Sequence, residues 1–195
     1  RNEVLSPDIA SLQVTADDKW LQMPIMQLGS GSVMNIAFDD LTHEYHRYAY
    51  KLEHCEADWT VSDQLFASDY CKGFADGNTI DDMEESINTS VQYTHYRLQI
   101  PNDRCVPTIS GNYRLTVYDD NTQDTVFKAC FMIVEQQTAV ALGVTTNTDI
   151  DINRSHQQVS MKLGYGAIAV REQQKEIKTV VLQNGCWTNA VCNAT

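Results

Sequence analysis

Large apolar side chains fall on every second residue in four segments of this sequence, and this period of two constrains the fold more than any other feature. The segments are Tyr48–Glu53, Tyr96–Ile100, Tyr113–Val117 and Phe127–Ile133. Successive side chains of a β-strand point to opposite faces, so each segment is expected to be a strand with one apolar face. Short alternating strands separated by turns predict an all-β fold in which antiparallel sheets pack as a sandwich.

A hairpin and a glycine turn refine this prediction. Tyr113–Tyr118 and Val126–Val134 flank turn-forming residues and are expected to pair as a hairpin, and Ser32–Phe38 is expected to be a further strand. Tyr113 follows Gly111 at the entry to a late strand. Immunoglobulin-like sandwiches place a tyrosine there whose hydroxyl bonds back to the backbone, although a tyrosine also suits any half-buried strand. The pattern favours an antiparallel immunoglobulin-like β-sandwich.

The charge balance divides the chain into two parts. Residues 1–135 carry most of the acidic side chains, whereas residues 136–195 are nearly neutral, and a polar stretch begins at Glu135. We therefore expect a β-sandwich domain over 1–135 and the start of a second, smaller or truncated β domain over 136–195. Within the second region, Asn184-Gly185 predicts a tight hairpin turn. Its expected strands are Ala139–Thr145, Gln157–Tyr165 and Ile177–Gln183.

The net charge argues against two classes of partner. With 26 acidic and 14 basic residues the chain carries a formal charge of −12, so its surface repels the phosphates of nucleic acids and of anionic lipids. A membrane-spanning helix needs roughly 20 consecutive apolar residues, and no run in the sequence approaches that length. We expect a folded chain with no nucleic-acid partner and no direct membrane insertion.

Six cysteines bear on the cellular compartment. None lies in a C-x-x-C pair, so a zinc site is not expected, and an even number suits an oxidising compartment although buried thiols are also common. The chain begins at Arg1 without an export signal, which we interpret as a mature or trimmed form. Cys186 and Cys192 are expected on one strand, too far apart to pair. Cys71 and Cys105 lie in predicted loops and could pair, as one of many possible connectivities.

No spacing in the sequence matches a known catalytic or metal site. Adjacent acidic pairs such as Asp39-Asp40 and Asp81-Asp82 could supply acid–base partners, which makes a hydrolase the third and weakest functional hypothesis. The loop Asp76–Asp82 is rich in oxygen ligands but lacks the ligand and glycine positions of a helix–loop–helix calcium site. We therefore expect no catalytic residues, no metal and no cofactor, and we expect that the chain is not an enzyme.

The segment Glu56–Ser90 shows little alternation yet carries many aromatic and aliphatic side chains. Long loops in compact domains tend to be functional or disordered, and this aromatic content argues against disorder. The segment is expected to fold back and cap the sandwich, or to form an arm presented to a protein partner; the two are compatible, and we favour the cap. The candidate partner-binding residues are Trp59, Phe66, Tyr70 and Phe74.

Five strings, in this order, resemble the N-terminal region of the type IX secretion system plug protein, a family of Bacteroidota formerly of unknown function. They are Phe38–Leu41, Tyr50–Trp59, Tyr93–Leu98, Ser110–Tyr113 and Val181–Trp187. The resemblance implies an exported, non-enzymatic β protein, periplasmic or associated with the outer membrane. It also implies an outer-membrane translocon protein as the partner, whose channel the plug closes when no cargo passes. Family members are larger, so the chain looks like a fragment that ends inside a second region.

Two functional hypotheses from different classes follow. The leading one is a non-enzymatic exported protein-interaction module that resembles the plug of the type IX translocon. The alternative is a glycan-binding accessory β-sandwich module, in which Trp20, Trp59 and Trp187 stack on sugar rings. Core packing is the ordinary role of each tryptophan, so the glycan hypothesis requires at least two of them to be exposed on one flat face.

Overall fold

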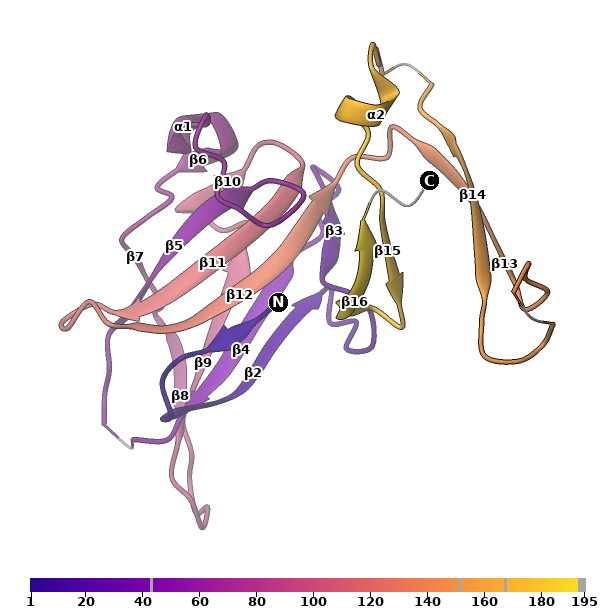
Figure 1. Ribbon diagram of the computed structural model, residues 1–195. Coiled ribbons are helices and arrows are strands. Elements are labelled where there is room, and N and C mark those ends of the chain that lie inside the picture. The colour runs from indigo at the N-terminus through magenta and orange to yellow at the C-terminus, as the bar shows by residue number, and fades with distance from the viewer. Residues whose placement is uncertain (43, 151, 167, 193–195) are drawn as a thin grey trace. The chain divides into compact units, whose positions relative to one another are not determined.

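The computed structural model describes residues 1–42, 44–150, 152–166 and 168–192, and Figure 1 shows that strands dominate the chain. Its internal contacts divide the chain into two compact units. The first unit comprises Arg1–Glu135 together with the hairpin of β15 (Val180–Gln183) and β16 (Cys186–Cys192), and the second unit is Gln136–Thr179. The sequence predicts this hairpin in the second region, 136–195, whereas the structure groups it with the first unit.

The first unit is a sandwich of two sheets. One has the strand order β1–β12–β11–β5–β7, with β3 also on β12, and the other has the order β2–β4–β9–β8. The strands of the first sheet are β1 (Glu3–Val4), β3 (Ile25–Gln27), β5 (Tyr48–Cys55), β7 (Asn78–Thr79), β11 (Gly111–Asp119) and β12 (Thr125–Val134). Those of the second are β2 (Ile9–Ala16), β4 (Met34–Asp40), β8 (Asp82–Glu85) and β9 (Thr94–Ile100). The predicted all-β sandwich is confirmed, with β3 and β12 as a parallel pair at its edge.

The alternation in the sequence places large side chains between the two sheets. Phe38 of β4 stacks on Tyr96 of β9, and its ring centroid lies 4.8 Å from that of Phe127 on the facing sheet. The other large side chains that are fully buried include Tyr50, Leu52, Tyr113, Leu115, Phe131 and Ile133. Because burying one such side chain stabilises the fold by about 1.5–3 kcal/mol, this layer of aromatic and aliphatic side chains contributes much of the stability of the first unit.

The predicted hairpin and tyrosine contact are both present. β11 and β12 pair antiparallel, with Tyr113 opposite Phe131. The Tyr113 hydroxyl donates a hydrogen bond of 2.8 Å to the carbonyl of Ile109, just before the strand begins. Since the ring is fully buried, this bond satisfies a polar group that would otherwise lose its contact with water. The bond fixes the corner through which the chain enters β11.

The Asn184-Gly185 turn closes the hairpin of β15 and β16, as predicted. Both residues have positive φ angles, 54° and 68°, which a two-residue turn of this kind requires. In the second unit, β13 (Ala139–Thr145) pairs antiparallel with β14 (Gln158–Gly164), and α2 (Gln173–Glu176) is a single helical turn.

A buried carboxylate lies at the end of β4. Asp40 is fully buried, and it accepts hydrogen bonds from the backbone N–H and hydroxyl of Thr42 and from the hydroxyl of Tyr48. The Nδ1 atom of His46 lies 2.7 Å from Oδ2 of Asp40. Burial alone would raise the pKa of Asp40, but the Thr42 N–H, His46 and the two hydroxyls together hold it below its usual value. The network joins the end of β4 to the start of β5.

Replacing Asp40 with Asn tests this network. The substitution removes the charge that these donors stabilise, so we expect the free energy of unfolding at pH 7 to fall by about 2–3 kcal/mol in urea titrations. A carboxyl with a lowered folded-state pKa contributes stability above its unfolded value of about 4, and loses it as the pH falls through the folded value. The gap between wild type and Asp40→Asn should therefore narrow below pH 4. The exposed Asp103→Asn is the control; equal effects of the two variants would contradict the assignment.

Candidate functional site

The segment 56–77, here called the cap, folds back over one end of the sandwich. It contains α1 (Ala67–Tyr70) and β6 (Cys71–Gly73), and β6 pairs antiparallel with β10 (Cys105–Pro107). Backbone N–H groups of Thr108 and Phe74 donate to the carbonyls of Tyr70 and Arg104, at 2.9 and 2.8 Å. Figure 1 shows α1, β6 and β10 together at this end. Residues 56–77 therefore cap the sandwich, as predicted for Glu56–Ser90, whereas the rest of that predicted segment supplies the edge strands β7 and β8.

The first residues of the cap form a tight turn. The N–H of Glu56 donates to the carbonyl of Thr60, and the N–H of Trp59 donates back to the carbonyl of Glu56. Asp58 accepts hydrogen bonds from the hydroxyl and the N–H of Thr60, which hold the pKa of Asp58 below its usual value. Trp59 itself has a positive φ of 74°. The string His54–Trp59, part of the family resemblance, thus comprises the end of β5 and this tight turn.

His54 connects this turn to the entry of β11. Its Nδ1 lies 2.8 Å from the hydroxyl of Ser62, and its ring meets the Tyr113 ring edge-on at 5.3 Å between centroids. The ring occupies the space beside Gly111, where an added Cβ would lie 2.1 Å from His54 Nε2. Gly111 also has a φ of +149°, which side-chain-bearing residues rarely adopt. Gly111 is required both by its backbone conformation and by the His54 ring.

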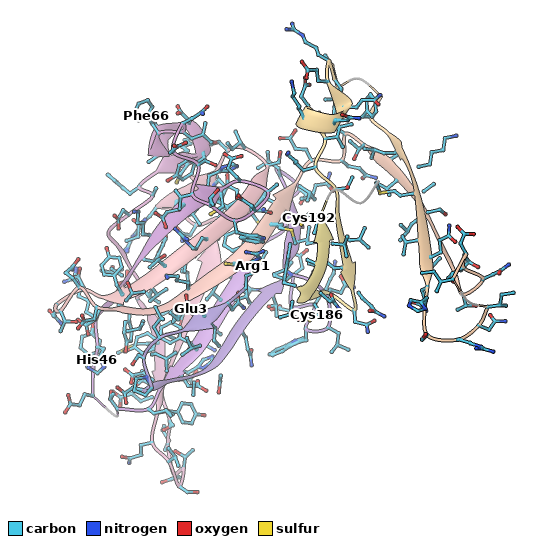
Figure 2. All side chains as sticks on the ribbon, viewed as in Figure 1. Arg1, Glu3, His46, Phe66, Cys186 and Cys192 are labelled. Atoms are coloured by element: carbon cyan, nitrogen blue, oxygen red, sulfur yellow. The ribbon has the colours of Figure 1, made fainter. Side chains whose placement is uncertain are left out.

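The four candidate partner-binding residues separate into two pairs. Trp59 and Tyr70 are each 8% exposed, and Tyr70 donates its hydroxyl to the carbonyl of Leu52 beneath the cap. Phe66 and Phe74 are 78% and 71% exposed. Figure 2 shows Phe66 projecting outward beside α1. The buried pair holds the cap on the sandwich, and the exposed pair is available to a partner.

The backbone under each exposed phenylalanine is fixed. The N–H of Phe66 donates to the Asp69 carboxylate, at the start of α1. The carbonyl of Phe74 accepts a hydrogen bond of 2.5 Å from the Asn78 side chain. The cap therefore presents two aromatic rings from an ordered backbone, and such rings lose little conformational entropy on binding.

An aromatic contact between distant parts of the sequence was missed by the sequence analysis. The rings of Trp59 and Trp187 meet edge-on at 5.5 Å, and the Arg1 guanidinium lies over both. This contact helps to place the β15–β16 hairpin in the first unit. Periodicity in the sequence cannot predict a contact between Trp59 and Trp187, which are far apart in the chain. The one signal for it was that both residues lie in strings that resemble the same family.

The three tryptophans differ in exposure. Trp59 is buried, Trp187 is half-buried against it, and Trp20 is 66% exposed. Trp20 borders a groove of about 570 Å³ on the outer face of the second sheet. Its neighbours there include polar side chains such as Asn35 and Gln99, which hydrogen-bond to each other. Of the three tryptophans, Trp20 alone is mostly exposed, whereas the glycan hypothesis requires two on one face.

The two acidic pairs are placed differently: Asp81 and Asp82 both line the groove that Trp20 borders, whereas Asp39 and Asp40 diverge. Asp40 faces the core, whereas Asp39 lies on the other face of β4 with His95 Nδ1 at 2.6 Å. Asp81 pairs with Arg104 at 2.7 Å, and its neighbour Asp82 lies on the edge strand β8. Among the described residues, no three His, Cys, Asp or Glu side chains are grouped so as to hold a metal ion. Each of these four carboxyls lies within 3.5 Å of a histidine or arginine nitrogen.

Replacing Gly111 with Ala tests the packing of His54. The new methyl group would displace the His54 ring and strain the backbone, so we expect the free energy of unfolding to fall by about 2–3 kcal/mol in urea titrations. Gly77→Ala is the matched control, because Gly77 also has a positive φ but nothing lies within 4 Å of its added Cβ. Its loss should be about 1 kcal/mol. Equal losses for both variants would show that the His54 ring is not the limiting contact.

Comparison with known proteins identifies the family. The family model described as the first domain of the type 9 secretion system plug protein matches residues 9–135. A crystal structure of a hypothetical protein from Parabacteroides merdae has 41% sequence identity and a TM-score of 0.92, covering 98% of this chain and 48% of that one. The chain thus spans about half the length of that relative, and no curated protein matches it. Since the family model covers more than half of the sequence, the chain belongs to the type 9 secretion system plug protein family.

Proposed function

We propose that this chain is part of an exported, non-enzymatic interaction module that binds the outer-membrane translocon of the type IX secretion system and helps to close its channel. The observation that carries the proposal is the match of the plug-protein family model to residues 9–135. Closing a channel requires a rigid body whose surface fits another protein, and a two-layer sandwich with one hydrophobic core supplies such a body.

The cap is the surface that we expect to contact the translocon. Phe66 and Phe74 are exposed on an ordered backbone, and aromatic side chains of this kind dominate the binding energy of protein interfaces. The Tyr70 side chain is buried against β5 and the Trp59 side chain against Trp187, so these two residues hold the cap and do not contact the partner directly. We therefore assign the partner contact to Phe66 and Phe74.

The net charge of the chain and its expected location agree with binding to an outer-membrane translocon. The formal charge of −12 favours a partner surface with basic side chains, and it makes the association rate dependent on salt. No helix among the described residues is long and apolar enough to cross a membrane. We place the protein in the periplasm or at the outer membrane through its translocon partner.

Co-purification from native membranes tests the proposal. The full-length protein that contains this chain is tagged in a strain that possesses the translocon, and the wild type should recover the translocon. Phe66→Ala/Phe74→Ala should weaken recovery at least about tenfold, since each truncated aromatic at the centre of an interface removes 1 kcal/mol or more. Failure of the wild-type protein to recover the translocon would contradict the proposed function.

A matched control isolates the cap. Ile87 is 82% exposed in the β8–β9 connection, outside the cap. Ile87→Ala should recover the translocon as the wild type does. Equal recovery by Phe66→Ala/Phe74→Ala and wild type would assign the contact to another surface, and a urea titration would show that all three proteins are folded.

A further inference from the structure

Two buried thiols meet where the cap joins the sandwich. Cys71 begins β6 and Cys105 begins β10, and their Sγ atoms lie 3.1 Å apart. Cys71 is 3% exposed and Cys105 is fully buried. A disulfide needs the two sulfur atoms at about 2.05 Å, so a shift of about 1 Å would bring them to bonding distance.

The backbone holds the two sulfurs in this position. β6 and β10 pair antiparallel, with Cys105 opposite Gly73 and Cys71 opposite Pro107, so both cysteines lie on the same face of the pair. An added Cβ at Gly73 would lie 2.1 Å from the carbonyl oxygen of Arg104. Glycine at this position therefore permits the close approach of the two strands.

The other four cysteines are arranged differently. Cys55 and Cys130 lie on β5 and β12, which are separated by β11. Cys186 and Cys192 are the first and last residues of β16. Figure 2 shows these two apart on that strand. Among the described residues, Cys71 and Cys105 are the pair with a sulfur–sulfur contact.

We propose that Cys71 and Cys105 form a disulfide bond that fastens the cap to the sandwich in the exported protein. The bond closes the segment of chain between the two cysteines, which contains β7, β8 and β9. A cross-link across a segment of this length stabilises the fold by restricting the unfolded chain. The bond would also fix β6, which directly precedes Phe74, to β10.

The oxidation proceeds by thiol–disulfide exchange with an oxidant of the disulfide class. One cysteine thiolate attacks a sulfur of the oxidant, which forms a mixed disulfide and releases one oxidant thiol. The second cysteine thiolate then attacks the Sγ of the first, which forms the protein disulfide and releases the second oxidant thiol. Two thiol protons leave the protein, and its two electrons reduce the oxidant to two thiols.

The burial of the Cys71 and Cys105 thiols determines at which stage of folding the disulfide can form. Burial, with the neighbouring Cys71 thiol, raises the pKa of Cys105 far above its usual value. The Cys105 thiolate is therefore scarce in the folded protein, and the 3% exposure of Cys71 limits the access of an oxidant to its sulfur. The bond should form while the chain folds or while the cap is open, and it should then resist external reductants.

Thiol mapping of the wild-type chain tests the proposal. The protein is refolded in a buffer of reduced and oxidised glutathione, denatured without reductant in the presence of iodoacetamide, and digested for mass spectrometry. We expect a linked peptide pair that contains Cys71 and Cys105, with the other four cysteines alkylated. Alkylation of Cys71 and Cys105, or a link between other cysteines, would overturn the proposal.

Thermal unfolding supplies a second readout. The oxidised wild type should have a Tm about 5–10 °C above that of the protein reduced under denaturing conditions and refolded. Cys71→Ala/Cys105→Ala should lose this difference, whereas Cys186→Ala/Cys192→Ala should keep it. A Tm of the wild type that does not change with oxidation would contradict the proposal, as would a shift that persists in the Cys71→Ala/Cys105→Ala variant. If Cys71→Ala/Cys105→Ala does not fold, the thiol mapping of the wild type decides whether the disulfide forms.

Discussion

The buried side chain of Tyr113 joins the core of the sandwich to its cap. Its ring stacks on Phe131 within the first sheet and meets Tyr70 and His54 edge-on from the cap side. Its hydroxyl donates to the carbonyl of Ile109 and lies 3.4 Å from that of Tyr70. One residue thus supports the strand entry, the aromatic core and the position of α1. The position of Tyr70, the last residue of α1, is thereby tied to the core.

Most of the sandwich could be predicted from the sequence because strand burial follows a period of two. The alternation in β5, β9, β11 and β12 identified the core strands, and Gly111 at the entry to β11 marked Tyr113 as one of two possibilities, a corner tyrosine or an ordinary strand residue. The same parity extends along β4 and places Asp40 on the core face after Met34, Ile36 and Phe38, a signal that the sequence analysis did not use. Because acidic residues are mostly exposed to solvent, the residue type suggested an exposed Asp40, although its position in the alternation indicates the core face.

The candidate site was only partly predictable because the cap has no period. Composition identified the segment as ordered, but it could not separate the aromatic side chains that face inward from those that face outward. That separation is decided by individual contacts across the chain, such as the hydrogen bond from Tyr70 to Leu52 and the contact of Trp59 with Trp187. The rings of Phe66 and Phe74 remain 78% and 71% exposed.

The positions of Phe66 and Phe74 depend on the cap being a rigid part of the sandwich and not a loose loop. Hydrogen exchange of backbone amides tests it most directly, because protection reports the free energy of opening each hydrogen bond. The account predicts that the amides of Phe74 and Thr108, which join the cap to β10 and its neighbour, are protected nearly as strongly as the amides of β11. Exchange of these amides at the rate of an unstructured chain, with β11 still protected, would contradict the claim.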